Sequence, residues 1–389
     1  MDEARWNQII SAMGRGPPSM EREDDRPVVF FRTPWERLDD GWSIAARAYA
    51  RVMEMGGLNV CLSSWSPYQG AVDETVLADV GHMAKTPTVW DAHVFSCTLG
   101  PGAAMAPIMK NMRDNQGPQA YHCVFERQYI EPELVDALNL LDGVWAQCSA
   151  NRDVLVNHGV KNVTLIHHPW FDDDPHLNLE PPRQCKRFYW IGRSEPRKAP
   201  DRLVRAFVRA FKPGEAELTL KLSMYLHPGA YPPVQQALAA ELPINGWTRE
   251  NWQQHIHIIH DRLSRDGMVR LHADHDVYVS ASRGEGLDLP AFAAKLAGRQ
   301  LVLTDSGGPR DFVNDGDVLV PACGLVPASP EYPWGDGATY FDHRLEDLVA
   351  ALQSVRGKRP VGSRVPEKLN ARNVSREMSR WIESLRCGE

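Results

Sequence analysis

The sequence predicts two α/β domains, each built on a parallel, doubly wound sheet. Short apolar runs of strand length alternate with segments of helical periodicity along most of the 389 residues, the pattern of a parallel sheet covered by helices on both faces. The chain is too long for one ordinary hydrophobic core, so two cores of fewer than about 200 residues each are expected. The acidic, proline-bearing stretch 171–184 lacks periodicity and is the expected linker.

These observations divide the chain into four segments. We expect a helix and linker at 1–26, a Rossmann-like N-terminal domain at 27–172, a second Rossmann-like domain at 173–360 and a closing helix within 361–389.

The apolar runs place the elements of both domains. N-terminal strands are expected at 28–32, 59–63, 92–97, 119–125, 143–148 and 162–167, and C-terminal strands at 186–191, 218–223, 255–260, 277–279 and 301–303. Helices are expected at 44–53, near 108, at 133–141, from 149 or 151 to 159, at 203–211, within 227–251, and at 266–273, 289–297, 345–355 and 374–385. After Asp311 the chain is expected to be irregular.

Composition restricts the class of protein. A hydrophobic content of 43% and a charged content of 24% are typical of soluble globular proteins. No apolar run approaches the roughly 20 residues that span a bilayer, and the acidic N-terminus lacks a signal-peptide core, so we expect a cytoplasmic protein. The seven cysteines include no CxxC pair and are expected to be reduced thiols, not zinc ligands or a disulfide framework.

The net charge of −7 argues against general electrostatic binding of nucleic acid but leaves room for a local basic face. The C-terminal stretch supplies one, which the sequence alone cannot distinguish from a solvated helix and linker. Its basic residues are Arg356, Lys358, Arg359, Arg364, Lys368, Arg372, Arg376 and Arg380.

The stretch 276–311 concentrates the features of a binding site. Gly284–Asp288 forms a tight turn between a buried strand and a helix, with Pro290 in the first helical turn and Asp288 placed to accept from the free N–H groups. Gly307 and Gly308 follow the next strand at the same edge of the sheet. Two such turns side by side predict a pocket of backbone N–H groups suited to phosphate and sugar oxygens.

The segments SRGEGLDLP, AFAAKLAG and VLTDSGGPRDFV, in this order, resemble the donor-binding signature of retaining glycosyltransferases of the family 4 type, which have the GT-B fold. The resemblance implies that the two domains face each other across a ligand-binding cleft. The resemblance implies that Glu285 lies against the transferred sugar and that the amides of Gly286, Leu287, Asp288 and Leu289 hold the donor. Two positions depart from the family: Ala293 replaces the glutamate that usually holds the ribose, and Asp288 stands where glycine is common.

The turn GRSEPRK after the strand at 186–191 resembles the diphosphate-binding turn of the same family. The resemblance assigns Gly192, Arg193 and Lys198 to the donor, with Arg193 and Lys198 on its diphosphate. Fixed positive charge is what a leaving diphosphate requires when no metal is present. The family places the nucleotide base at the loop of Asp261 and Arg262.

In the N-terminal domain, the resemblance implies a histidine near the sugar. His122 and Glu126, toward the end of their strand, are the candidates, with His93 behind them, and spacing alone does not choose among them. Gly41, in the first turn, is a candidate for donor phosphate contact from this domain. It is equally consistent with a glycine that serves only the turn.

Other chemistries find little support. The triplet Asp274, His275 and Asp276 could hold a divalent metal, but it precedes a buried strand, where a helix-ending aspartate is common. His255, His257 and His260 lack zinc-type partners at standard spacing. No GxSxG or GxxxxGK[ST] motif is present. We therefore expect neither a metal nor a cofactor besides the co-substrate.

Three functions remain open. The first is a retaining, metal-independent hexosyl- or pentosyltransferase using a UDP- or GDP-type sugar and a glycan, lipid-linked or small-molecule hydroxyl acceptor. The second is transfer to a modified base in DNA, as phage-type enzymes perform, which the basic C-terminal face and the tryptophans permit. The third, motivated by Ala293, is a sugar-nucleotide-binding protein with weak or no catalysis.

Overall fold

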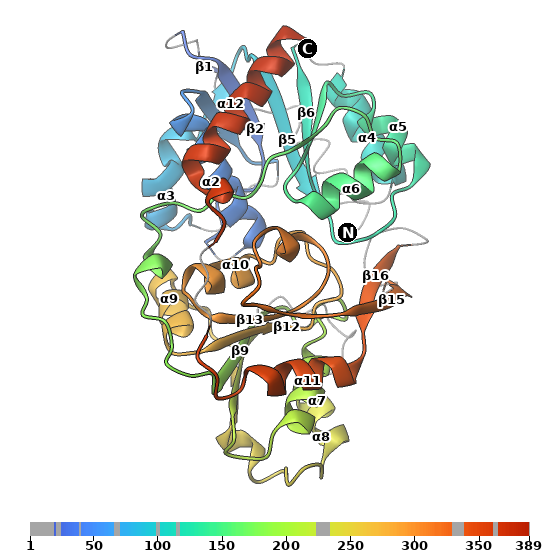
Figure 1. Cartoon of the computed structure of the whole chain (residues 1–389). Helices are drawn as coiled ribbons and strands as arrows, with labels where there is room; N and C mark the ends of the chain where they lie inside the picture. Colours follow the sequence, from blue (N-terminus) through green and yellow to red (C-terminus); the bar gives the residue numbers. More distant parts are fainter. Residues whose placement is uncertain are drawn as a thin grey trace. The chain divides into compact units, whose positions relative to one another are not determined.

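The computed structural model describes residues 19–20, 25–38, 40–65, 71–98, 102–113, 117–222, 234–328, 338–360 and 365–388. The described chain divides into two compact units (Figure 1). The first unit takes in the residues up to Asp172 and those from Glu367 onward, and the second takes in Asp173–Tyr332 and Thr339–Pro366. Most of the expected segment 1–26 lies outside the described residues.

The first unit contains a six-stranded parallel sheet in the order β3-β2-β5-β6-β7-β8. Its strands are β2 (Val28–Arg32), β3 (Asn59–Ser63), β5 (Ala92–Thr98), β6 (Gln119–Val124), β7 (Gly143–Ala146) and β8 (Val163–Leu165), with a separate short pair of β1 (Ser19–Met20) and β4 (Thr86–Pro87). The helices are α2 (Gly41–Met55), α3 (Glu74–Val80), α4 (Gly102–Arg113), α5 (Pro132–Leu138), α6 (Ser149–Asn157) and α12 (Ala371–Cys387), and the 3-10 turns are η1 (Gly81–Met83) and η5 (Glu367–Leu369).

Local sequence explains how α2 begins and ends. The Asp40 carboxylate accepts from Ser43 N at 3.0 Å and caps the first turn. Gly56 ends the helix, and the next strand, β3, begins at Asn59. Helix α12, from the C-terminal end of the chain, packs against α2 (Figure 1). It contributes Trp381 to the core around Trp145.

The second unit contains another six-stranded parallel sheet, in the order β11-β10-β9-β12-β13-β14. Its strands are β9 (Arg187–Gly192), β10 (Glu217–Leu222), β11 (Ile256–Ile259), β12 (Val277–Ser280), β13 (Gln300–Thr304) and β14 (Val318–Val320). The helices are α7 (Pro200–Ala210), α8 (Val234–Glu241), α9 (Arg265–Ala273), α10 (Leu289–Leu296) and α11 (Leu345–Val355), and the 3-10 turns are η2 (Pro175–Asn178), η3 (Trp252–Gln254) and η4 (Gly308–Asp311). Two doubly wound parallel sheets are thus confirmed.

One expectation about the fold is wrong. The chain after Asp311 is not irregular, because β14 extends the main sheet and β15 (Ala322–Pro327) pairs antiparallel with β16 (Thr339–His343). These strands lack the alternation of buried and exposed side chains that marks a strand in sequence, since β15 is exposed or half-buried throughout.

In the described part of the chain, no helix has both the length and the apolar character needed to cross a bilayer.

Candidate active site

The candidate site lies where two neighbouring strands of the second unit end. Strands β9 and β12 pair in the centre of the sheet, and each leads through a short turn into a helix, α7 or α10. Arg283 N donates to Arg197 O at 2.8 Å, so the two turns lie side by side. The carboxyl ends of parallel strands are where such folds bind ligands.

Glu285 is the centre of a buried charge network. Its Oε1 lies 2.5 Å from Lys198 Nζ and its Oε2 lies 3.4 Å from Arg197 Nη1. Arg197 also donates to Gly284 O at 2.6 Å and to Glu195 Oε1 at 2.8 Å. Burial alone would raise the pKa of Glu285, but Lys198 and then Arg197 outweigh it and hold the pKa below the usual value. Glu285 is therefore an ionised carboxylate at neutral pH.

The sequence did not single out Arg197 or Glu195. The family resemblance gave the role of diphosphate-binding arginine in this turn to Arg193. The structure brings Lys198 to Glu285 and places Arg193 at the exposed start of the same turn, one residue after Gly192. Both arginines belong to one short turn without periodicity, so the sequence carries no signal that separates them.

Asp288 is a second buried carboxylate at the same turn. It has a left-handed backbone, with φ of 66°, and its Oδ1 accepts from Tyr278 Oη at 3.1 Å and from Ala291 N at 3.3 Å, which caps α10. Its Oδ2 is buried without a hydrogen-bond partner among the described residues. Burial, followed by the charge of Glu285, raises the pKa of Asp288 to about 6.

The predicted meeting of the two glycine turns is confirmed. Gly308 N donates to Glu285 O at 3.1 Å. A Cβ added at Gly308 would lie 2.0 Å from Gly286 O, and one at Gly307 would lie 2.5 Å from Glu285 O, so both positions admit only glycine without displacing backbone. The pair therefore sets the position of the Glu285 turn.

The β15–β16 pair supports the same turns from another side. Arg283 Nε lies 3.2 Å from Asp342 Oδ1, and Arg283 Nη1 donates to Pro196 O at 2.9 Å. Phe341 N donates to Arg283 O at 3.0 Å. These contacts fix the backbone between β12 and Glu285 against the end of β16.

The first unit places the other candidates in different surroundings. His122 is buried in β6, where Nδ1 lies 2.8 Å from Ser96 Oγ and the ring stacks on Trp145 at 4.0 Å. Burial, followed by the charge of His168, lowers the pKa of His122 to about 3, so this ring is neutral at physiological pH. His93 is also buried, with Nδ1 2.6 Å from Gln119 Oε1.

The remaining candidates lie nearer the surface. Glu126 is partly exposed two residues beyond β6, and Gly41 is the exposed first residue of α2. Asp261 and Arg262 are exposed in the connection from β11 to α9, and Leu289 is partly exposed at the start of α10.

The acidic triplet before β12 is structural. Asp276 is buried and accepts from Lys186 N at 3.0 Å and Arg187 N at 2.7 Å, and His275 Nε2 lies 2.8 Å from Thr219 Oγ1. A search of the residues with described positions finds no group of three or more His, Cys, Asp or Glu side chains able to hold a metal.

Asp288→Asn is expected to stabilise the protein by about 2 kcal/mol near pH 8 and by little near pH 4. The folded state raises the pKa of Asp288 from 3.8 to about 6. Protonated Asp288 therefore contributes its full share to the free energy of unfolding below pH 3.8, and this contribution is lost as the pH rises through about 6. Asparagine keeps the cap and tolerates the left-handed backbone without becoming charged.

Urea unfolding at several pH values measures this difference. The exposed Asp315→Asn is the matched control and is expected to show no such trend. A stability difference between wild type and Asp288→Asn that stays constant from pH 4 to pH 8 would contradict the assignment.

Comparison with known proteins finds a family match in the second unit. Residues 185–330 match the family model described as "Glycosyl transferases group 1", and this range contains both turns of the site. The match covers a little over a third of the chain. No curated protein sequence matches it.

Solved structures show that the chain has the GT-B fold. The lipopolysaccharide outer core galactosyltransferase WaaB matches with a TM-score of 0.61 at 12% identity, covering 92% of this chain and 99% of that one. Anabaena Alr3699/HepE in complex with UDP-glucose gives 0.57 at 12% identity over 92% and 100%. Sucrose-phosphate synthase from Thermosynechococcus elongatus gives 0.56 at 13% identity over 92% and 95%. The chain spans 55% of the length of the S. aureus TarM structures that it also matches.

Proposed function

We propose that the chain is a glycosyltransferase that moves a sugar from a nucleoside diphosphate to a hydroxyl acceptor, with retention at the anomeric carbon and without a metal. The observation that carries the proposal is the buried contact of Lys198 Nζ with Glu285 Oε1 at 2.5 Å. This contact joins the turn that the family resemblance assigns to the diphosphate with the turn that it assigns to the sugar, both inside the matched range 185–330.

In this proposal, Glu285 accepts hydrogen bonds from hydroxyl groups of the transferred sugar. Its ionised state suits that role, because a carboxylate presents only acceptors. Lys198 neutralises the diphosphate as the bond to the sugar breaks, and Arg193 at the exposed start of the turn adds positive charge. The incoming diphosphate competes with Glu285 for Lys198, so donor binding loosens this contact and frees Glu285 for the sugar.

Retention is proposed to proceed without a strong protein base. The leaving phosphate takes the proton of the acceptor hydroxyl on the face from which it departs, so no histidine is required for that step. The burial of His122 and its pKa of about 3 agree with a positioning role for that ring. Glu126, partly exposed after β6, remains the candidate in the first unit for contact with substrate.

A protein that binds the donor without turnover is the second candidate. Ala293 lies on α10 and has no carboxylate to hold a ribose, the role that the family resemblance gives to this position. Transfer to DNA is a variant of the leading proposal that concerns only the acceptor.

A panel of UDP- and GDP-sugars tests the proposal. UDP-glucose is the first donor to use, because it is bound in the Alr3699/HepE structure. We expect wild type to release a nucleoside diphosphate from at least one donor in the presence of EDTA, and proton NMR of the product to show the donor's anomeric configuration. The control variant is Glu250→Gln, at an exposed glutamate outside the site. Binding of a donor without release by wild type would favour the second candidate, and inversion would contradict retention.

A further inference from the structure

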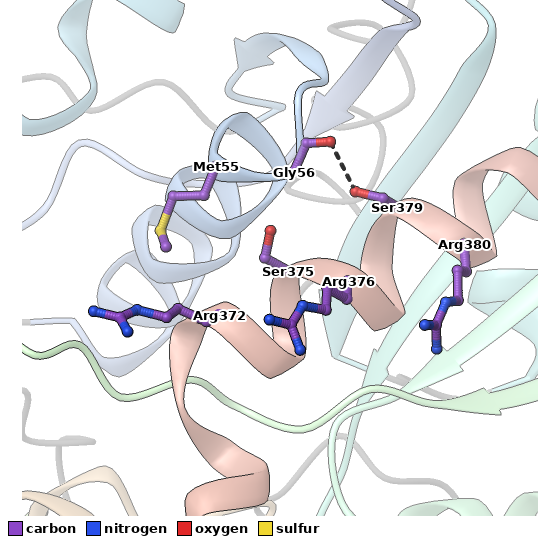
Figure 2. Close-up of a pocket in the computed structure, with 7 residues that line it drawn as sticks. All are labelled: Met55, Gly56, Arg372, Ser375, Arg376, Ser379 and Arg380. Carbon is purple, nitrogen blue, oxygen red and sulfur yellow. Dashed lines mark hydrogen bonds between the residues drawn. The ribbon is translucent and has the colours of Figure 1, made fainter.

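A groove on the first unit lies outside the candidate site. It has a volume of about 430 Å³ and runs between the end of α2 and one face of α12 (Figure 2). Its lining consists of Met55, Gly56, Arg372, Ser375, Arg376, Ser379 and Arg380.

The floor of the groove is built from small residues. Ser379 Oγ donates to Gly56 O at 3.1 Å (Figure 2). A Cβ added at Gly56 would lie 2.1 Å from Ser379 Oγ and 3.0 Å from Ser375 Oγ. The close approach of the two helices at this glycine leaves the longer arginine side chains standing as the wall of the groove.

The wall carries three positive charges in a row. Arg372, Arg376 and Arg380 recur every four residues of α12, so their Cα atoms are about 6 Å apart along the axis. Arg372 pairs with Asp172 at 2.7 Å, but both side chains are mostly exposed, at 72% and 54%, and such pairs contribute little. Among the described residues, Arg376 Nη1 makes a single, long hydrogen bond of 3.5 Å to Asn373 Oδ1.

Negative charge near the groove is weak by comparison. None of the described residues that line it is acidic, and Glu54, beside Met55, pairs with His82 at 2.7 Å. Glu377 and Glu383, on α12, each lie three residues from Arg380 in sequence, and the pKa of Glu377 is raised chiefly by burial. The C-terminal end of α2 carries about half a negative charge, and Gly56 O at that end accepts from Ser379. Three formal cations outweigh these groups.

We propose that this groove binds the phosphodiester backbone of a nucleic-acid duplex. Guanidinium groups match phosphate oxygens in a bidentate manner. A row about 12 Å long follows successive phosphates and does not enclose a single one. The described lining contains no aromatic side chain that could stack on unpaired bases, so the groove fits a paired backbone better than a single strand.

A membrane surface fits the groove less well. A helix that lies in the bilayer interface inserts an apolar face opposite its basic face. The apolar residues of α12 are already committed to the core, with Trp381 6%, Ile382 0% and Leu385 8% exposed. Met55, at the end of α2, is the one apolar side chain among the seven described residues of the lining.

The groove anchors the nucleic acid away from the chemistry of sugar transfer. Gly56 lies three residues before β3, so the groove is at the edge of the sheet where strands begin. Reacting groups in doubly wound folds lie at the opposite edge, where strands end. The inference therefore concerns substrate or template anchoring and stands independently of the proposed donor site.

Fluorescence anisotropy with a labelled 20-base-pair duplex tests the inference. Three phosphate contacts give a slope of log K against log salt of about −2.7, so wild type is expected to bind about 40-fold more weakly at 200 mM than at 50 mM salt. The triple variant Arg372→Gln, Arg376→Gln, Arg380→Gln is expected to lose this binding. Arg380→Gln alone should reduce the slope by about 1.

A second triple variant controls for net charge. Arg183→Gln, Arg249→Gln and Arg344→Gln remove three exposed arginines outside the groove and are expected to leave the slope unchanged. Circular dichroism checks that each variant is folded. No binding by wild type at 50 mM salt, or equal loss in both triple variants, would overturn the proposal. Tighter binding to phosphatidylserine vesicles than to the duplex would do the same in favour of a membrane.

Discussion

Glu285→Gln is expected to lower kcat/KM for sugar transfer by about 10³-fold and to cost about 3 kcal/mol of stability. The loss of activity follows if the carboxylate contacts the sugar, because glutamine cannot present two ionised acceptor oxygens. The loss of stability follows from the buried charges that remain. Lys198 and Arg197 both lie against this carboxylate, and their cations lose a partner in a region where Glu285 is only 8% exposed.

The double variant Lys198→Met, Glu285→Gln separates these two effects. Removing both charges leaves no uncompensated ion, since Arg197 keeps its 2.8 Å contact with Glu195, so stability is expected to return to within about 1 kcal/mol of wild type. Activity is not expected to return, because both proposed donor contacts are gone. Urea unfolding and a diphosphate-release assay on the four proteins complete the cycle. Additive stability losses would show that the 2.5 Å contact contributes no coupling, and wild-type turnover by Glu285→Gln would remove this residue from the mechanism.

The sheets could be predicted from sequence because each strand is a continuous apolar run between turn residues. Strand β2, with five buried residues, has the pattern of a parallel strand covered on both faces. The starts of some helices could also be predicted from residue type. Asp40 caps α2, and Pro290 lies in the first turn of α10.

The same two-sided burial explains what the sequence did not reveal. A histidine within a parallel strand faces helices on either side of the sheet, so neither His122 nor His93 reaches solvent. Histidine is a common catalytic residue type, so both were candidates, but their positions in the sheet surround both rings with core residues. The β15–β16 pair went unrecognised for a different reason: its strands are separated by more than ten residues and have few buried side chains, so local pattern does not mark them.

The backbone conformation of the turn after β9 places Lys198, and not Arg193, against Glu285. Ala199, immediately after Lys198, has a left-handed backbone with φ of 47°. That conformation is unfavourable for alanine and is not signalled by its side chain. Asp288 has the same kind of backbone at the start of α10, so a strained residue stands at the beginning of both helices of the site. Such strain persists only where surrounding contacts enforce it, which is common at functional sites.

Gly308→Ala is expected to destabilise the protein by about 3 kcal/mol and to abolish donor binding. Its Cβ would lie 2.0 Å from Gly286 O, 2.7 Å from Gly286 C and 2.8 Å from Leu287 Cα. All three are backbone atoms, so no side-chain rotation relieves the overlap. The Glu285 turn must move as a whole, which separates Glu285 from Lys198 and displaces the amides proposed to hold the sugar.

Gly81→Ala is the matched control for this substitution. Gly81 has an ordinary helical backbone, and an added Cβ would lie 3.5 Å from its nearest neighbour, so alanine is expected to be neutral or slightly stabilising there. Gly308, unlike Gly307, does not have a positive φ. The destabilisation caused by Gly308→Ala would therefore come from steric overlap rather than from backbone conformation. Calorimetric binding of UDP and thermal unfolding measure the two effects. Wild-type UDP affinity in Gly308→Ala would mean that the position of the glycine pair does not govern the donor site.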